Sequence, residues 1–242
     1  MIQRILIILT IVTGANSIAQ ATPITQADFS ASVVTIGFDT YPGGASIPGI
    51  VVPPFSGNVI NLDSVIDYGY ASQGVVFSST GGGVTAVGQD TTNQLTGISS
   101  PNVVVGMTGA LNYSASAPIY IDFVDPLTGL PCFSTMVGAY ARDVDTQPVP
   151  FVAYNASGVE LGKTYFSVTG NGGISFAGLT FGPTVEIARI EINSPGVDTI
   201  GIDNLMFEPA GHVAGHVIPE PITIVLLGTG LFGMIGGRRK NR

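Results

Sequence analysis

Short runs in which apolar and polar residues alternate, or in which β-branched residues cluster, recur along the middle of the chain. They occupy residues 32–39, 74–79, 83–88, 101–106, 117–125, 135–143, 149–155, 159–168, 173–179, 185–193 and 199–207. Turn-forming residues separate them, as in "YNASGVE", where Gly158 can adopt a positive φ and close a hairpin. The pattern predicts an all-β domain over residues 22–208, a two-sheet β-sandwich of the jelly-roll type.

The first 21 residues follow a different pattern. Arg4 precedes an aliphatic run from Ile5 to Val12, and small residues follow as far as Ala19 and Ala21, which form an A-x-A site. These features are typical of a secretory signal peptide. We therefore expect cleavage after Ala21 and export of the remaining chain. The alternatives are an uncleaved anchor and a buried helix.

The C-terminal end holds a second apolar segment. Residues 222–237 are sixteen positions without a charge, and basic residues follow them directly. A membrane-spanning helix needs about 20 predominantly apolar residues, so this segment is a marginal span. The basic residues predict that its end stays in the cytoplasm while the domain lies outside. Pro219 and Pro221 prevent the helix from extending upstream, and residues 209–218 form the expected linker.

This C-terminal end resembles the PEP-CTERM sorting signal, which combines a Pro-Glu-Pro triplet, a Gly-rich apolar helix and an arginine cluster. The matching residues are Pro219, Glu220 and Pro221, then Leu226, Leu227, Gly228 and Gly230, and finally Arg238 and Arg239. The resemblance implies that residues 219–242 insert transiently into the inner membrane of a Gram-negative bacterium. The resemblance also implies that an exosortase recognises them there and removes the tail, and that the protein reaches the cell surface or extracellular matrix. A plain single-span anchor is the alternative.

The charge of the exported part narrows the range of partners. Between residues 22 and 217 there are three basic residues and fifteen acidic ones, a net charge of −12. Such a surface repels nucleic acid and anionic lipid and attracts cations. We therefore expect no nucleic-acid partner. Cys132 is the only cysteine, so the chain has no internal disulfide.

A second resemblance concerns the domain itself. The segments "GFDTYPGG" (37–44), "YGYASQGVVFSS" (68–79) and "TIGIDNLMF" (199–207) resemble the lectin-like jelly-roll ectodomains that are common among PEP-CTERM proteins. This resemblance implies the fold and carries no catalytic residues across.

Aspartates at the ends of predicted strands are candidate ligands for a structural calcium ion. Asp39 follows the first strand, Asp203 and Asn204 lie in the last, and Asp143 ends another. Carboxylate and carbonyl oxygens are the ligands that calcium prefers. In many lectin-like sandwiches the terminal strands lie side by side, which would bring Asp39 and Asp203 to one ion. The alternative is that these residues only cap turns and strand ends.

Catalytic motifs are missing from the sequence. It contains no G-x-S-x-G elbow, no H-E-x-x-H and no phosphate-binding loop between a strand and a helix. The two histidines, His212 and His216, both lie in the linker. A glycosidase needs only two carboxylates, and the acidic residues leave that alternative open. We expect a protein that is not an enzyme.

Aromatic side chains are the groups that stack on sugars, and tryptophan is absent. Tyr68 and Tyr70 would share one face if their segment is extended, which makes them weak candidates for ligand binding. The sequence therefore indicates a non-catalytic surface or matrix protein that associates with exopolysaccharide in biofilm or floc formation. A secreted hydrolase of matrix polysaccharide and a purely structural protein are the alternatives.

Overall fold

The structure is a computed structural model. It describes residues 21–48, 50–52, 65–80, 84–90, 98–99, 102–109, 112–113, 117–170, 172–183, 186–193 and 200–209. All of these belong to the first of two compact units, Met1–Ala210. Residues 1–20 of the expected signal peptide, residues 210–218 of the expected linker and the sorting segment lie outside the described residues, whereas Pro209 is the last residue of a strand. No helix in the described part of the chain is long and apolar enough to span a membrane.

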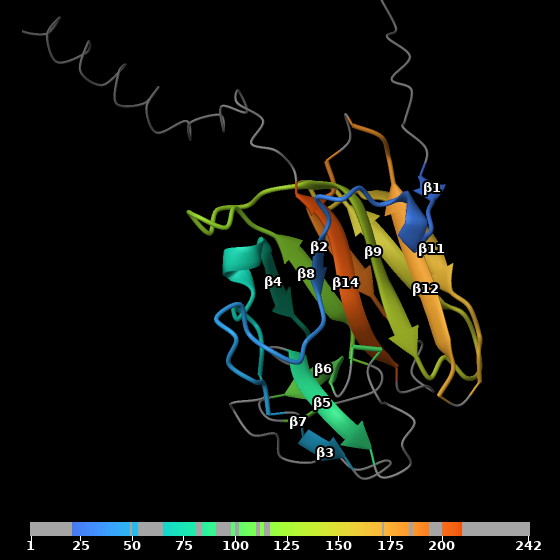
Figure 1. The fold of residues 1–242 in the computed structure, drawn as a ribbon. Coiled ribbons are helices and arrows are strands. Elements are labelled where there is room, and N and C mark those ends of the chain that lie inside the picture. The colour runs from blue at the N-terminus through green and yellow to red at the C-terminus, as the bar shows by residue number, and fades with distance from the viewer. Residues whose placement is uncertain are drawn as a thin grey trace, which may run out of the picture. The chain divides into compact units, whose positions relative to one another are not determined.

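One sheet contains the first and last strands of the domain (Figure 1). Its strands are, in spatial order, β1 (Thr22–Pro23), β12 (Ile174–Thr180), β9 (Ser134–Arg142), β14 (Gly201–Pro209) and β2 (Val34–Ile36). All of these neighbours are antiparallel. We call this part the first sheet.

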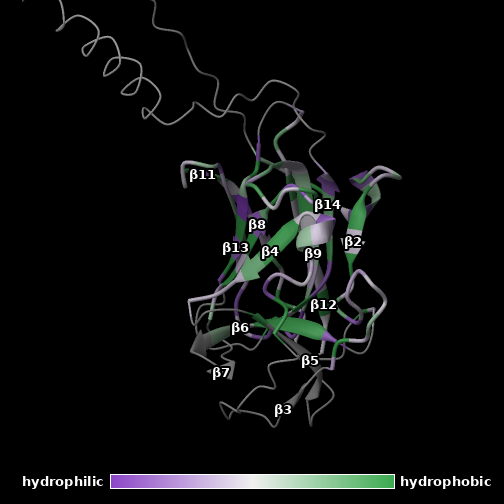
Figure 2. Cartoon of the chain, turned by 90° about the vertical axis from the view of Figure 1, so that its left-hand side faces the viewer, coloured by the Kyte–Doolittle hydropathy of each residue, from purple (hydrophilic) through white to green (hydrophobic). Residues whose placement is uncertain are grey.

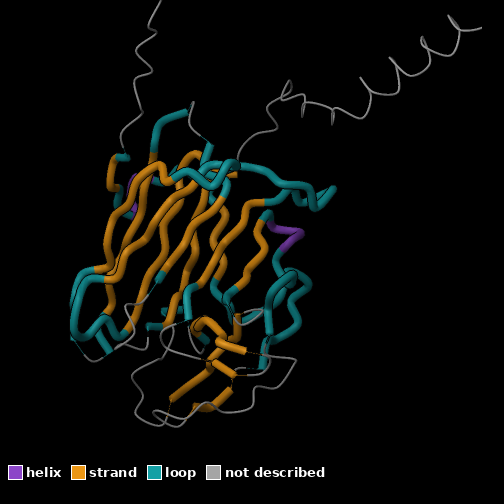
Figure 3. Tube along the Cα trace, turned by 180° about the vertical axis from the view of Figure 1, so that it is seen from behind, coloured by secondary structure: helices purple, strands orange, loops and turns teal. Residues whose placement is uncertain are grey.

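The second sheet has five antiparallel strands. In spatial order they are β11 (Glu160–Phe166), β10 (Val149–Tyr154), β13 (Arg189–Ile192), β8 (Ile119–Phe123) and β4 (Val75–Ser78). The two sheets form separate layers, which Figure 2 shows from the side, and Figure 3 shows the strands from behind with the loops that join them.

The connections between the two sheets are those of a jelly roll. The strands β2, β14, β9 and β12 are neighbours in one sheet, and β8, β13, β10 and β11 are neighbours in the other. If these eight strands are counted along the chain, the spatial orders are 1-8-3-6 and 2-7-4-5. Two interlocked Greek keys of this kind define the jelly roll. The expected two-sheet sandwich is therefore confirmed, with β4 as an extra edge strand.

A smaller group of strands extends the first sheet (Figure 1). It contains β3 (Ile50–Val52), β5 (Val84–Asp90), β6 (Val103–Gly109) and β7 (Asn112–Tyr113). Strand β6 joins it to the sandwich through the pairing of Val104 with Ile202 of β14. Strands β3 and β5 are parallel, whereas the other pairs in this group are antiparallel.

Alternation along the strands explains where the core lies. In β8, Ile119, Ile121 and Phe123 are buried while the residues between them are partly exposed. Since successive side chains on a strand point to opposite faces, one face of each sheet is apolar and the other meets solvent. The apolar faces meet between the sheets, and Figure 2 shows the hydrophobic residues along β4 and its neighbours.

The strands agree with the alternating segments of the sequence. Each predicted segment contains a strand, and Gly158 has the expected positive φ of 74°. The short strands β1, β3 and β7 were not predicted, since two or three residues carry too little periodicity. The only helices in the described ranges are the 3₁₀ turns η1 (Gln26–Asp28) and η3 (Ala71–Gln73).

Candidate functional site

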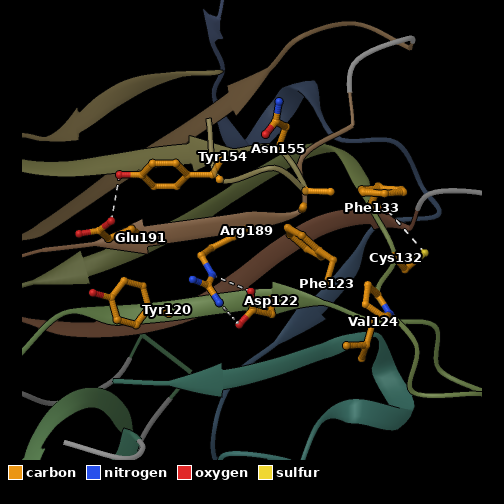
Figure 4. A pocket seen from close by; sticks show the side chains of 14 residues that line it. Tyr120, Asp122, Phe123, Val124, Cys132, Phe133, Tyr154, Asn155, Arg189 and Glu191 are labelled. Carbon is orange, nitrogen blue, oxygen red and sulfur yellow. Dashed lines mark hydrogen bonds and ion pairs between the residues drawn. The ribbon is translucent and has the colours of Figure 1, made fainter. Parts of the chain in front are cut away.

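A hollow of about 570 Å³ lies on the outer face of the second sheet, and we call it the groove (Figure 4). Its polar and aromatic lining comes from Tyr120 and Asp122 of β8, Arg189 and Glu191 of β13, and Tyr154 of β10. Residues of two loops, among them Pro131, Cys132, Phe133, Asn155 and Gly158, complete it. The groove therefore combines three adjacent strands with the loops at one end of them.

Strand register brings the polar residues of the groove together. On β8 the buried Ile121 lies between Tyr120 and Asp122, so these two side chains point outward. Asp122 pairs with Arg189 across β8 and β13, and Arg189 pairs with Tyr154 across β13 and β10. Residues that are far apart in the sequence thus form one row across the sheet.

Arg189 is the central charge of the groove. Its Nε donates to Oδ1 of Asp122 over 2.7 Å, and its Nη2 donates to Oδ2 over 3.0 Å. This hydrogen bond raises the pKa of Arg189, so the guanidinium stays charged. The guanidinium carbon also lies 5.3 Å from the ring centroid of Tyr120, within the range of a cation–π contact. The side chains of Arg189 and Asp122 are 46% and 33% exposed, so a ligand can reach both.

Tyr154 and Glu191 form a second pair in the groove. The Tyr154 hydroxyl donates to Oε2 of Glu191 over 2.9 Å. Burial, and next this hydrogen bond, raise the pKa of Tyr154 to about 12. The phenol therefore stays protonated at neutral pH, and the bond fixes its ring on the floor of the groove.

The loop between β10 and β11 gives the groove a fixed wall. Oδ1 of Asn155 accepts hydrogen bonds from the backbone amides of Ser157 and Val159, both over 2.9 Å. Gly158 completes this hairpin with its positive φ. On the other side Cys132 is half-buried and is a free thiol.

These groups together fit a ligand rich in hydroxyls. Tyrosine rings offer apolar faces to C–H groups, while carboxylate and guanidinium groups exchange hydrogen bonds with hydroxyls. Two carboxylates, Asp122 and Glu191, face one guanidinium, so the groove carries a small negative charge. It therefore disfavours an anionic ligand.

The calcium candidates lie where β2 and β14 run side by side. Ile36 pairs with Leu205, so the terminal strands are neighbours as expected. Asp203 is fully buried, and its carboxylate accepts from the Ser99 amide over 2.8 Å and from the Asn204 amide over 2.7 Å. Asn204 has a φ of 45° and lies at a bulge in the pairing with β9.

Asp39 also holds a backbone amide. Its Oδ1 accepts from the amide of Asn102 over 2.9 Å. Among the described residues, no three His, Cys, Asp or Glu side chains are grouped so that they could hold a metal ion. A shared calcium at Asp39 and Asp203 stays a prediction, and both residues also match the capping alternative.

Tyr68 and Tyr70 lie in a turn that leads into η3, and no extended strand contains them. Tyr68 is exposed, whereas Tyr70 is buried in the core and donates its hydroxyl to the carbonyl of Thr40 over 3.0 Å. The two rings therefore do not share a face, which removes the basis on which they were chosen as ligand-binding candidates. The sorting residues Pro219, Glu220, Pro221, Arg238 and Arg239 lie outside the described residues.

The groove was missed at the level of sequence. Its residues lie in "APIYIDFVD", "VPFVAYN" and "VEIARIEIN", where they occupy the polar positions of alternating strands. Such positions are usually only solvent-facing, and the pattern does not tell which strands are neighbours. One signal could have indicated the groove: these outward positions hold aromatic or charged residues rather than Ser or Thr.

Comparison with solved structures gives distant likenesses only. TmCBM61, solved in complex with β-1,4-galactotriose, is 14% identical with a TM-score of 0.36, covering 64% of this chain and 99% of its own. CBM29-2, a family 29 carbohydrate-binding module solved as a mutant, is 11% identical with a TM-score of 0.34, covering 74% and 92%. The enzymatically active domain of bacteriophage CBA120 tailspike protein 4 is 12% identical with a TM-score of 0.32, covering 63% and 21%. Likenesses this distant do not identify a ligand.

Comparison at the level of sequence gives one result. No curated protein matches the chain. Residues 217–240 match the family described as the PEP-CTERM protein-sorting motif. This range contains the Pro-Glu-Pro triplet, the apolar segment and the first basic residues. The chain therefore carries a PEP-CTERM sorting motif at its C-terminal end.

Proposed function

We propose that this protein is exported, sorted by an exosortase to the cell surface or matrix, and there holds extracellular polysaccharide without cleaving it. The sorting motif at residues 217–240 and the expected signal peptide support the delivery. The observation that carries the binding role is the groove, in which Tyr120, Tyr154 and the Asp122–Arg189 pair face solvent together. In this role the protein contributes to the cohesion of biofilms or flocs.

The charge of the domain indicates which glycans it holds. Residues 22–217 carry a net charge of −12, and the groove adds two carboxylates to one guanidinium. Neutral polysaccharides meet no repulsion there, whereas anionic ones need divalent cations between the two surfaces. Weak single contacts suffice, because many displayed copies raise the effective concentration.

The partners of the groove carboxylates favour binding over hydrolysis. Both oxygens of Asp122 accept from Arg189, and Glu191 accepts from Tyr154. A glycosidase needs one carboxylic acid that gives a proton and one carboxylate that acts as nucleophile or base. These two residues are already engaged as hydrogen-bond acceptors, which suits fixed contacts to a ligand.

Binding by the groove is tested with the mature protein and a panel of neutral polysaccharides: a galactan, a glucan and a mannan. Tyr154→Ala and Arg189→Gln are expected to weaken retention in affinity electrophoresis at least tenfold, equivalent to about 1.4 kcal/mol. Tyr165→Ala is the matched control, since Tyr165 is an exposed tyrosine on β11 that does not line the groove. If all variants are retained equally, the groove is not the binding site. If new reducing ends appear, the protein cleaves the polysaccharide, which favours the alternative of a secreted hydrolase.

Sorting is tested by mass spectrometry of the surface-located protein. The mature chain is expected to begin near Thr22 and to lack residues 238–242, which include four basic ones. Glu220→Gln should leave the tail attached, because the triplet loses its only charge. Glu160→Gln makes the same change at an exposed residue of the domain and should be processed normally. An intact basic tail on most surface-located wild-type protein contradicts exosortase processing.

A further inference from the structure

A second hollow lies on the outer face of the first sheet, on the side of the sandwich opposite to the groove. Its volume is about 670 Å³, and Ile24, Thr25, Gln26, Ala27, Tyr140 and Phe176 line it. Tyr140 belongs to β9 and Phe176 to β12, and the register pairs them directly. All six lining residues are uncharged, in a domain whose charge is strongly negative.

The floor of this hollow is formed by the rings of Tyr140 and Phe176, and the Phe176 ring packs against two glycines. The Phe176 and Tyr140 rings lie 5.0 Å apart with an edge-to-face angle of 64°. Gly138 and Gly178 are partners two rows further along the same pair of strands, on the same face of the sheet. A Cβ at Gly138 would lie 2.5 Å from Cζ of Phe176, and one at Gly178 would lie 3.0 Å from its Cε1. The glycines thus allow the Phe176 ring to lie close against the sheet.

The wall of the hollow is the segment that follows β1. Strand β1 pairs with β12, as Figure 1 shows, and the amide of Ile24 donates to the carbonyl of Gly178 over 3.1 Å. The Tyr140 hydroxyl donates to the side-chain oxygen of Gln26. Asp28 accepts from the amide and hydroxyl of Thr25 and completes a capping box. These hydrogen bonds hold the wall in place. The side-chain amide of Gln26 and the hydroxyl of Thr25 therefore lie beside the aromatic floor.

We infer that this hollow is a second binding site for a neutral sugar unit, so that one domain holds two glycan chains. The inference rests on the proposed function of the groove. An apolar ring face beside uncharged hydrogen-bonding groups suits a neutral pyranose, and the lack of a cation in the lining gives an acidic sugar no partner. The two sites face away from each other across sheets that pack about 10 Å apart. A glycan lying on one outer face cannot lie on the other, so the domain cross-links two chains or two distant stretches of one chain.

Isothermal titration with oligosaccharides of the neutral polysaccharide that the mature protein retains measures the number of sites. The wild type should bind two equivalents, Tyr154→Ala one, Phe176→Ala one, and the double variant none. The intact polysaccharide should become turbid with the wild type, and the turbidity should be lost with either single variant. Gln26→Ala removes an exposed amide together with its contact to the Tyr140 hydroxyl, so it should weaken the second site while changing the melting temperature little.

Ile174→Ala is the matched control. Ile174 is exposed on β12, two residues before Phe176 and on the same face, but it does not line the hollow. This variant should keep two equivalents and full turbidity. A wild type that binds one equivalent, or two equivalents retained in both Phe176→Ala and Gln26→Ala, would overturn the second site and leave the groove intact. A wild type that retains none of the polysaccharides would overturn both proposals.

Discussion

Phe38→Ala is expected to lower the free energy of unfolding by about 3–5 kcal/mol, because a large fully buried ring leaves a cavity. Phe38 is fully buried, just beyond β2. Its ring makes edge-to-face contacts with Tyr70 at 5.7 Å and with Phe77 of β4 at 5.5 Å. It therefore joins the end of β2 to the edge of the second sheet. Chemical denaturation of the mature protein measures the loss.

The control for this experiment is Leu127→Ala. Leu127 is 87% exposed, so the same kind of truncation there removes almost no buried area. Its free energy of unfolding should equal that of the wild type within about 0.5 kcal/mol. A Phe38→Ala protein as stable as this control would show that the contacts of Phe38 with Tyr70 and Phe77 do not hold the two sheets together.

Asp203→Ala is expected to lower the free energy of unfolding by about 1–3 kcal/mol, because backbone amides lose a buried acceptor. The amides of Ser99 and Asn204 and the hydroxyl of Ser99 all donate to this carboxylate. Asp203→Asn should not restore stability, since its amide group would place donors against donors. A neutral effect of both changes would mean that these hydrogen bonds contribute nothing.

The loss of unfolding free energy caused by Asp203→Ala should depend on pH. Burial raises the pKa of Asp203 above the value of 3.8 that the unfolded chain has, although the hydrogen bonds from Ser99 and Asn204 oppose this. The folded protein therefore takes up this proton before the unfolded chain does. As the pH falls from neutral towards 3.8, the wild type gains a contribution that Asp203→Ala lacks, so the difference between them should grow. A difference that shrinks over this range would contradict the raised pKa.

Melting with and without a chelator separates the amide-binding role of Asp203 from calcium binding. An ion present at 100 times its Kd stabilises the folded state by about 2.7 kcal/mol. If calcium joins Asp39 and Asp203, the chelator lowers the wild-type melting temperature and Asp39→Asn abolishes the response. If both aspartates only hold backbone amides, the wild type melts at the same temperature under both conditions.

The fold could be predicted from the sequence because each long strand buries one face. In "APIYIDFVD" the residues Ile119, Ile121 and Phe123 alternate with polar ones, and the structure buries these three. The spatial order of the strands was not predictable in this way, since alternation says which face is apolar and not which strand is next. The extension around β6 was missed as a separate group for the same reason.

The groove depends on pairings that no local pattern contains. Asp122 and Arg189 are partners only because β8 and β13 pair in the register that sets them opposite one another. The pairing of β2 with β14 was predictable, because resemblance to lectin-like sandwiches implied neighbouring terminal strands. The amide partners of Asp203 were not, since Ser99 lies 104 residues away in the sequence.

The position of β14 has a consequence for the order of folding. This last strand lies between β9 on one side and β2 and β6 on the other. The sandwich therefore cannot close until the final residues of the domain have left the ribosome, and contacts between sequence-distant strands form slowly. Such a chain stays open during synthesis. The sandwich is completed only when Gly201–Pro209 has been made, so folding of the domain finishes shortly before the sorting motif at residues 217–240 is synthesised.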